Sequence, residues 1–268
     1  GILIGVIAWR ISGSRVTGIF GAALALSSPF ILQMGSEYMA HMVTLASFCA
    51  FFLCVMLMYQ APSRSAWSRF VLPIATGFFA AWGVLSRPIS GLALAAPVVI
   101  FVAFTFWRQD KWWRWLIVAA AGLATMSIVL VINDGWNAYT GNNSQSFGAS
   151  TILGYGQFVI YQNIVSLLRH LFGWPYFATL AFALIPFVLG RFNRWNLLLF
   201  SGVAIQVLSY GSYNAGGLMY GPRYFFEISG ALCILTAQGI FAAARLAAMG
   251  AQRLFTVTPF ARALAHAP

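Results

Sequence analysis

The chain has 268 residues, of which 61% are hydrophobic and only 7% are charged, and its mean hydropathy is +0.83. Soluble domains contain about 25% charged residues, so this composition excludes an ordinary soluble protein and predicts an integral membrane protein. The formal net charge is +11. Because no run of five or six basic residues occurs, we interpret the basic residues as membrane-flanking charges and expect no nucleic-acid partner.

Apolar runs of near-spanning length predict an all-α, polytopic transmembrane bundle. The apolar stretch 1–9 is too short to cross a bilayer, which needs about 20 residues. We interpret it as a truncated N-terminal span, so the chain is expected to be a fragment cut through a helix. Eight full spans are predicted after it, at residues 16–33, 41–60, 70–86, 89–107, 115–132, 174–190, 196–213 and 225–246.

The 15 Lys and Arg residues divide unevenly between alternate loops. One set of loops holds all of them except Arg87, Arg169 and Arg223. By the positive-inside rule the richer set faces the cytoplasm, which predicts a multi-pass protein of the inner (plasma) membrane with a cytoplasmic C-terminus. The outer surface then carries most of the other ionisable residues: Glu37, His41, Asp134, His170 and Glu227.

The predicted organisation has four parts. Residues 1–132 form a transmembrane core, 133–173 a long extracytoplasmic loop, 174–246 the C-terminal transmembrane helices, and 247–268 a cytoplasmic tail. The loop begins with "NDGWNAYTGNNSQSFG", a polar stretch typical of irregular structure. Near its end, apolar residues recur at helical spacing, which predicts a short helix in the outer membrane interface. These residues are Ile160, Ile164, Leu167, Leu168 and Leu171.

Glu37 and His41, in "QMGSEYMAHM", are four positions apart and share a face if this segment is helical. Such a pair can bind a metal or provide acid–base chemistry. The alternative, which the spacing favours, is a glutamate at a helix end beside a histidine wetted at the interface. Two ligands do not define a metal site, and no glycine-rich nucleotide loop is present, so no metal or other cofactor is predicted.

Arg87 lies in "LSRPIS", between two predicted spans. Pro88 predicts a turn there, because the residue before a proline avoids the helical conformation. Two interpretations of Arg87 remain open. Its side chain either reaches out to the phosphates of the bilayer, or points inward and holds the phosphate of a bound lipid substrate with two hydrogen bonds.

The stretch "YGPRYFFE", from Tyr220 to Glu227, stands at the start of the last predicted span. Gly221 and Pro222 predict a turn, after which Arg223 and Glu227 lie one helical turn apart. The simpler interpretation is an ion pair within the helix. A charge at membrane depth costs about 2.5–3.5 kcal/mol, so such residues are usually paired or functional. The second interpretation is that the turn and the two tyrosines present Arg223 to an anion.

Five strings carry a resemblance to a known family: "SSPFILQMGSEYMAHM", "LSRPISGLALAAP", "NAYTGN", "LFGWP" and "YGPRYFFE". Together they resemble bacterial relatives of the protein O-mannosyltransferases and the lipid A aminoarabinose transferases, which have the C-type glycosyltransferase fold. The resemblance implies transfer of a sugar from a polyprenyl-phosphate carrier, with inversion, to a protein, lipid or glycan acceptor outside the cytoplasm. The family's main catalytic acid lies in a first outer loop that would precede Gly1, so this fragment is expected to be inactive alone.

The resemblance implies roles for Glu37, Arg87 and Arg223, and we assign the other candidate residues from their place on the predicted outer face. Glu37, His41 and Asp134 are the expected catalytic residues, and Arg87 and Arg223 are expected to bind the donor phosphate. Residues expected to orient the substrate are Asn137, Tyr139, Arg169, His170, Tyr220, Tyr224 and Glu227. Two rival functions remain: a polysaccharide polymerase or ligase, and a membrane transporter or flippase without chemistry.

Overall fold

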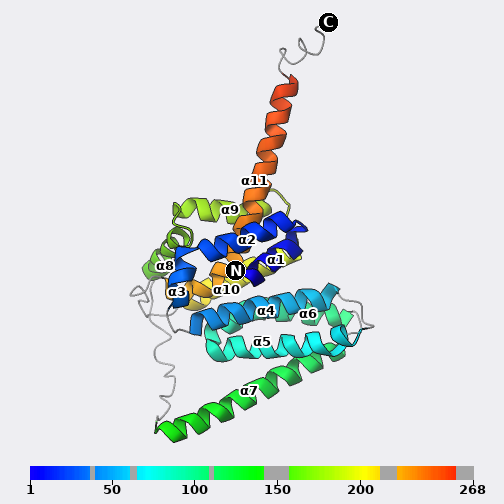
Figure 1. Cartoon of the computed structure of the whole chain (residues 1–268), viewed down its shortest axis with the longest axis vertical. Coiled ribbons are helices and arrows are strands. Elements are labelled where there is room, and N and C mark those ends of the chain that lie inside the picture. The colour runs from blue at the N-terminus through cyan, green and yellow to red at the C-terminus, as the bar shows by residue number, and fades with distance from the viewer. Residues whose placement is uncertain (37–39, 61–64, 109–111, 142–156, 212–221, 258–268) are drawn as a thin grey trace.

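The computed structural model describes residues 1–36, 40–60, 65–108, 112–141, 157–211 and 222–257 (Figure 1). Within these ranges every regular element is a helix, which confirms the predicted all-α class for this part of the chain. The helices are α1 (Ile2–Ser12), α2 (Arg15–Ser27), α3 (Pro29–Ser36), α4 (Ala40–Gln60), η1 (Trp67–Val71), α5 (Leu72–Ser86), α6 (Pro88–Arg108), α7 (Trp112–Thr140), α8 (Gln157–His170), α9 (Tyr176–Val188), α10 (Arg194–Gly211), η3 (Arg223–Ile228) and α11 (Ser229–Val257).

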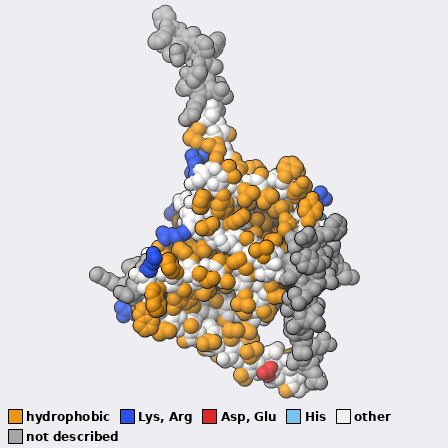
Figure 2. All heavy atoms as spheres, turned by 180° about the vertical axis from the view of Figure 1, so that it is seen from behind, with side chains coloured by type: hydrophobic (Ala, Val, Ile, Leu, Met, Phe, Trp, Pro, Cys, Tyr) orange, Lys and Arg blue, Asp and Glu red, His pale blue; other side chains and the backbone are white. Residues whose placement is uncertain are grey.

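Several of these helices could cross a membrane. Among the described residues, five stretches are long and apolar enough: Ala40–Gln60, Trp67–Ser86, Pro88–Thr105, Trp112–Thr140 and Arg223–Gly250. The bent pair of α2 and α3 would make a sixth. Neither α9 nor α10 is among them, and the 13 residues of α9 extend only about 20 Å against a hydrocarbon core of about 30 Å. Hydrophobic side chains cover most of the face in Figure 2, with Lys and Arg near its margins.

The predicted span 16–33 is not one straight helix. The axis bends by 55° between α2 and α3. Ser28 adopts an extended conformation before Pro29, as the residue before a proline prefers, and its hydroxyl accepts a hydrogen bond from the Ile31 backbone N–H at 3.2 Å. The same hydroxyl donates to the Leu171 carbonyl, just beyond α8, so a backbone carbonyl from a distant segment helps to hold the bend.

Polar contacts between distant helices define two opposite ends of the bundle. At one end, the start of α4, the α5–α6 turn, the end of α10 and η3 meet through the contacts described in the next subsection. At the other end, Asn193 donates to the Ile11 carbonyl at 3.1 Å, Arg114 donates to the Met58 carbonyl at 3.1 Å, and Arg194 contacts the Tyr59 hydroxyl. The second end gathers arginines from the basic loops, in keeping with the charge pattern of the sequence.

The interior is packed around α4 and the first half of α11. Phe52 and Met56 of α4 and Cys233 and Leu235 of α11 are fully buried. Trp195, at the start of α10, packs edge-on against Phe52 with 5.8 Å between ring centroids. A core of this kind fixes the relative positions of the helix ends that carry the polar residues.

Two helices extend further than predicted. α7 continues through Thr140, although irregular structure was expected from residue 133. Residues 133–140 contain no proline, so nothing in them breaks the backbone hydrogen bonds. α11 likewise continues to Val257, past the expected boundary at 246, and leaves the bundle at its C-terminal end (Figure 1). The helix predicted near residues 160–171 is confirmed as α8; its Leu167 and Leu168 are buried, as is Leu171, which follows it.

Candidate functional site

The most concentrated polar cluster surrounds Glu227, at one end of the bundle. Its side chain lies on η3 and is fully buried. One carboxylate oxygen, Oε1, lies 2.9 Å from Nδ1 of His41 and 3.1 Å from Nη1 of Arg87. A buried carboxylate is tolerated when it is paired and hydrogen-bonded, and Glu227 meets both conditions. The sequence separation of these three residues shows that the site is assembled by the tertiary fold.

His41 lies at the start of α4 with only 6% of its surface exposed. Its Nδ1 faces Oε1 of Glu227, and Nη1 of Arg87 lies 2.6 Å from Nε2 and also contacts Nδ1. With its proton on Nδ1, the neutral imidazole donates to the Glu227 carboxylate, and its Nε2 accepts from Nη1 of Arg87. Both ring nitrogens of His41 therefore have partners within the cluster.

The second carboxylate oxygen of Glu227, Oε2, accepts from the Ser90 hydroxyl at 3.2 Å and from Nε2 of Gln206 at 2.9 Å. Ser90 is also 2.9 Å from the Tyr210 hydroxyl, which accepts from Nη2 of Arg87 at 3.3 Å. Four donors thus converge on one carboxylate. This network holds the Arg87 guanidinium in one orientation.

Arg87 reaches this position because of the turn predicted at Pro88. It caps α5 in an extended conformation with φ −153°, and Pro88 begins α6. Its backbone N–H donates to the Gly83 carbonyl, and its carbonyl accepts from the Gly91 N–H at 2.8 Å. The sequence left open whether Arg87 points to the bilayer or inward. The structure turns it inward, onto Glu227.

Arg223 does not form the ion pair with Glu227 that was one of the two interpretations of their spacing. The prediction assumed an α-helix, in which residues four apart are separated by only about 40° around the axis. η3 is a 3₁₀ helix with about three residues per turn, so the same two residues point about 120° apart. Glu227 consequently turns into the core toward α4 and α6, while Arg223 stays half-buried at the surface.

Tyr224 lies between the two arginines. The Arg87 guanidinium carbon is 5.7 Å from the centre of its ring, and that of Arg223 is 5.1 Å away. Nη2 of Arg223 also donates to the Tyr224 hydroxyl at 3.1 Å, and the ring packs on Tyr210 at 5.4 Å. The Tyr224 side chain therefore contacts both of the arginines that were expected to bind phosphate.

The other predicted site residues fall into two groups. Glu37 and Tyr220 lie outside the described residues. Asp134, Asn137 and Tyr139 are on the last turns of α7, where Asp134 and Tyr139 are exposed and the helix extends away from its neighbours (Figure 1). Arg169 and His170 are exposed at the end of α8, and His170 bonds to Ser166 within its own helix. None of the latter five contacts the Glu227 cluster among the described hydrogen bonds and ion pairs.

The sequence analysis missed Ser90, Gln206 and Tyr210. A signal for Gln206 was present, because an amide in the middle of "GVAIQVLSY" must find hydrogen-bond partners once that helix is buried in an apolar environment. The described residues contain no group of three or more His, Cys, Asp or Glu side chains that could hold a metal ion.

The chain was compared with protein-family models, with curated proteins and with solved structures, and none of them matches. The fold and composition define the class only as a helical protein with several helices that could span a membrane.

Proposed function

We propose that this chain belongs to a membrane glycosyltransferase that takes a sugar from a polyprenyl-phosphate carrier and transfers it, with inversion, to an acceptor on the extracytoplasmic side. The observation that carries the proposal is the arrangement of charge around Tyr224. Two guanidinium groups lie close to this one ring, and the only carboxylate described beside them, Glu227, is bound to Arg87 and not to Arg223.

This arrangement favours an anionic ligand. Glu227 compensates Arg87, so Arg223 adds positive charge that no described carboxylate neutralises. The planar guanidinium can donate two hydrogen bonds to a single phosphate, which suits the head of a lipid phosphate. Arg223 is half-buried beside an apolar bundle, so a ligand with a phosphate head and a long apolar chain fits better than a small soluble anion.

The resemblance supplies the reaction. The acceptor hydroxyl attacks the anomeric carbon of the sugar, the bond from that carbon to the phosphate oxygen breaks, and the lipid phosphate leaves with additional negative charge. Arg223 and Arg87 would stabilise that charge as it develops. The resemblance assigns the base that takes the acceptor's proton to another outer loop. His41 and Glu227 would serve by positioning Arg87, since their polar atoms are occupied within the cluster.

The topology that goes with this proposal has the Glu227 end of the bundle outside and the arginine-rich end in the cytoplasm, with eight spans in an inner (plasma) membrane. The uneven distribution of basic residues supports this orientation. The bent pair α2–α3, α9 and α10 would then all cross the bilayer together with the five longer stretches.

A transporter is the second candidate, because one observation favours it. The break between α2 and α3 resembles the discontinuous helices that line transport sites. In transporters such helix ends point to a site near the membrane midplane. Here the polar cluster lies at an end of the bundle, which favours a lipid-phosphate site over a central transport site.

The proposal is tested by binding of an undecaprenyl-phosphate sugar to the purified chain in lipid nanodiscs. Arg223→Ala should weaken binding roughly ten- to a hundredfold, since a hydrogen bond to a charged group contributes about 1.5–3 kcal/mol. Arg223→Lys keeps the charge without the planar fork and should lose a large part of that affinity. Arg108→Ala is the matched control, because it removes an arginine that lies over one aromatic ring, Phe104, on a different helix.

Equal binding by wild type and Arg223→Ala would remove the basis of the proposal. Arg223-dependent binding of a small soluble anion, with no binding of the lipid-linked sugar, would favour the transporter. Transfer of radiolabelled sugar in membranes that carry the protein then tests the reaction separately from binding.

A further inference from the structure

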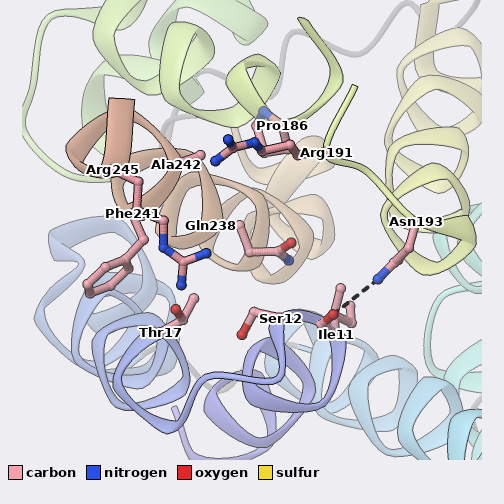
Figure 3. A pocket seen from close by; sticks show the side chains of 10 residues that line it. All are labelled: Ile11, Ser12, Thr17, Pro186, Arg191, Asn193, Gln238, Phe241, Ala242 and Arg245. Atoms are coloured by element: carbon pink, nitrogen blue, oxygen red, sulfur yellow. Dashed lines mark hydrogen bonds between the residues drawn. The ribbon is translucent and has the colours of Figure 1, made fainter. Parts of the chain in front are cut away.

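A second cationic site lies at the opposite end of the bundle. A cavity of about 150 Å³ opens between α2, α9 and α11, and Figure 3 shows the side chains that line it. Arg191 follows α9 and Arg245 lies on α11, and both guanidinium groups are directed into the space between these helices (Figure 3). None of the described residues that line the cavity is acidic.

The backbone conformation at the end of α9 sets the position of Arg191. α9 ends in a Schellman motif, in which the Arg191 N–H donates to the Pro186 carbonyl at 2.9 Å and the Gly190 N–H donates to the Phe187 carbonyl at 3.0 Å. Gly190 has φ 61°, a left-handed conformation that other residues adopt only at a cost. The motif turns the chain back over the end of α9, where Pro186 itself lines the cavity.

The polar side chains on the other walls have different roles. Asn193 is occupied, because its amide donates to the Ile11 carbonyl and its oxygen accepts from the backbone N–H groups of residues 195 and 196. Gln238 accepts from Asn196 at 3.0 Å, while its own Nε2 is buried and has no hydrogen-bond partner among the described residues. Thr17, from α2, contributes a buried hydroxyl-bearing side chain. The cationic groups of Arg191 and Arg245 are therefore the charged groups that line the cavity, next to the side chains of Thr17 and Gln238.

We propose that this cavity binds a phosphate group. Two guanidinium groups that line one cavity favour an anion between them, and guanidinium forks match phosphate oxygens. A volume of about 150 Å³ corresponds to roughly five water molecules at liquid density, enough to admit a phosphate group with accompanying water. The phosphate comes either from an anionic lipid headgroup or from free phosphate in solution. The site is separate from the Glu227 cluster and does not depend on the function proposed above.

The test compares two probes on the purified chain. Native mass spectrometry from detergent measures retention of phosphatidylglycerol against phosphatidylcholine, and a parallel titration with inorganic phosphate measures protection against thermal unfolding. For the probe that binds, the double variant Arg191→Ala/Arg245→Ala should lose at least about tenfold in affinity. Arg10→Ala is the control, because Arg10 lies at the same end on α1 but does not line the cavity.

The two probes distinguish the source of the phosphate. Arg191- and Arg245-dependent retention of phosphatidylglycerol identifies a lipid headgroup, and equally dependent protection by inorganic phosphate alone identifies a soluble ligand. If the alanine double variant does not fold, Arg191→Lys/Arg245→Lys keeps the charges without the forks and should still weaken binding. Unchanged binding in the folded double variants, or an equal loss in Arg10→Ala, would overturn the proposal in favour of general attraction to a basic surface.

Discussion

Nδ1 of His41 and Oε1 of Glu227 lie 2.9 Å apart although the two residues are separated by 186 positions in the sequence. This contact joins the start of α4 to η3, and Arg87 completes it from the α5–α6 turn. Three segments from different parts of the chain are thus held at one point by a single buried carboxylate. Loss of the Glu227 carboxylate should therefore loosen the contacts between all three segments.

Removal of the carboxylate should destabilise the protein. Glu227→Ala leaves the largely buried Arg87 without its acidic partner, and breaking a buried ion pair typically costs about 3–5 kcal/mol. The unfolding free energy, measured in mixed micelles, should fall by roughly this amount. Asp134→Ala, which removes an exposed carboxylate from α7, should leave it nearly unchanged.

A double-mutant cycle separates the pair from its surroundings. Arg87→Ala/Glu227→Ala should cost less than the sum of the two single changes, with a coupling of about 0.5–3 kcal/mol. Additive effects would mean that the ion pair contributes nothing to the stability of this end of the bundle.

Tyr224 should contribute to ligand affinity through its ring more than through its hydroxyl. Tyr224→Phe keeps the aromatic contact with both arginines, whereas Tyr224→Leu removes it; such contacts contribute about 0.5–2 kcal/mol. In the nanodisc assay we expect Leu to weaken binding of the lipid-linked sugar about fivefold or more, and Phe to weaken it less. Equal losses in the two variants would show that the hydroxyl carries the effect.

The orientation of the bundle can be measured by cysteine labelling in intact cells. Tyr139 is 85% exposed near the end of α7, and Ser65 is exposed just before η1. With an impermeant reagent, Tyr139→Cys should react and Ser65→Cys should react only after the cells are opened. Cys49 and Cys233 are buried and Cys54 is only partly exposed, so the native background is expected to be low. Labelling at 65 but not at 139 in intact cells would reverse the proposed topology.

Local features of the fold could be predicted from the sequence, whereas the contacts of the site could not. Pro88 correctly predicts the extended Arg87 and the turn after α5, because the restriction acts between neighbouring residues. Pro29 carries the same signal in "SSPF", yet the apolar run around it favoured one continuous span. The partners of Glu227 come from α4, α6 and α10, and no local pattern specifies such contacts.

The interpretation of Arg223 and Glu227 as an ion pair does not hold for a different reason. Spacing of four residues predicts a shared face only if the segment is an α-helix, and the tighter winding of η3 separates the two side chains. The sequence "RYFFEI" does not by itself distinguish the two kinds of helix. The packing of Phe225 and Phe226 into the core, where both are buried, accompanies the observed winding.

The attachment of α7 has a mechanical consequence. A methyl group on Gly77 of α5 would meet the Val118 carbonyl and lie 2.9 Å from the Gly122 backbone nitrogen, so the two helices touch closely at this point. Only 11% of the most apolar stretch of α7 is buried by other parts of the protein. In a bilayer, contact with lipid leaves no hydrophobic driving force to bury the rest. The buried residues of this 29-residue helix, Arg114 and Val118, both lie in its first two turns, so its C-terminal part extends from the bundle as an arm. A small tilt at Gly77 would be amplified along the arm, and Asp134 and Asn137, carried near its tip, would sweep the furthest.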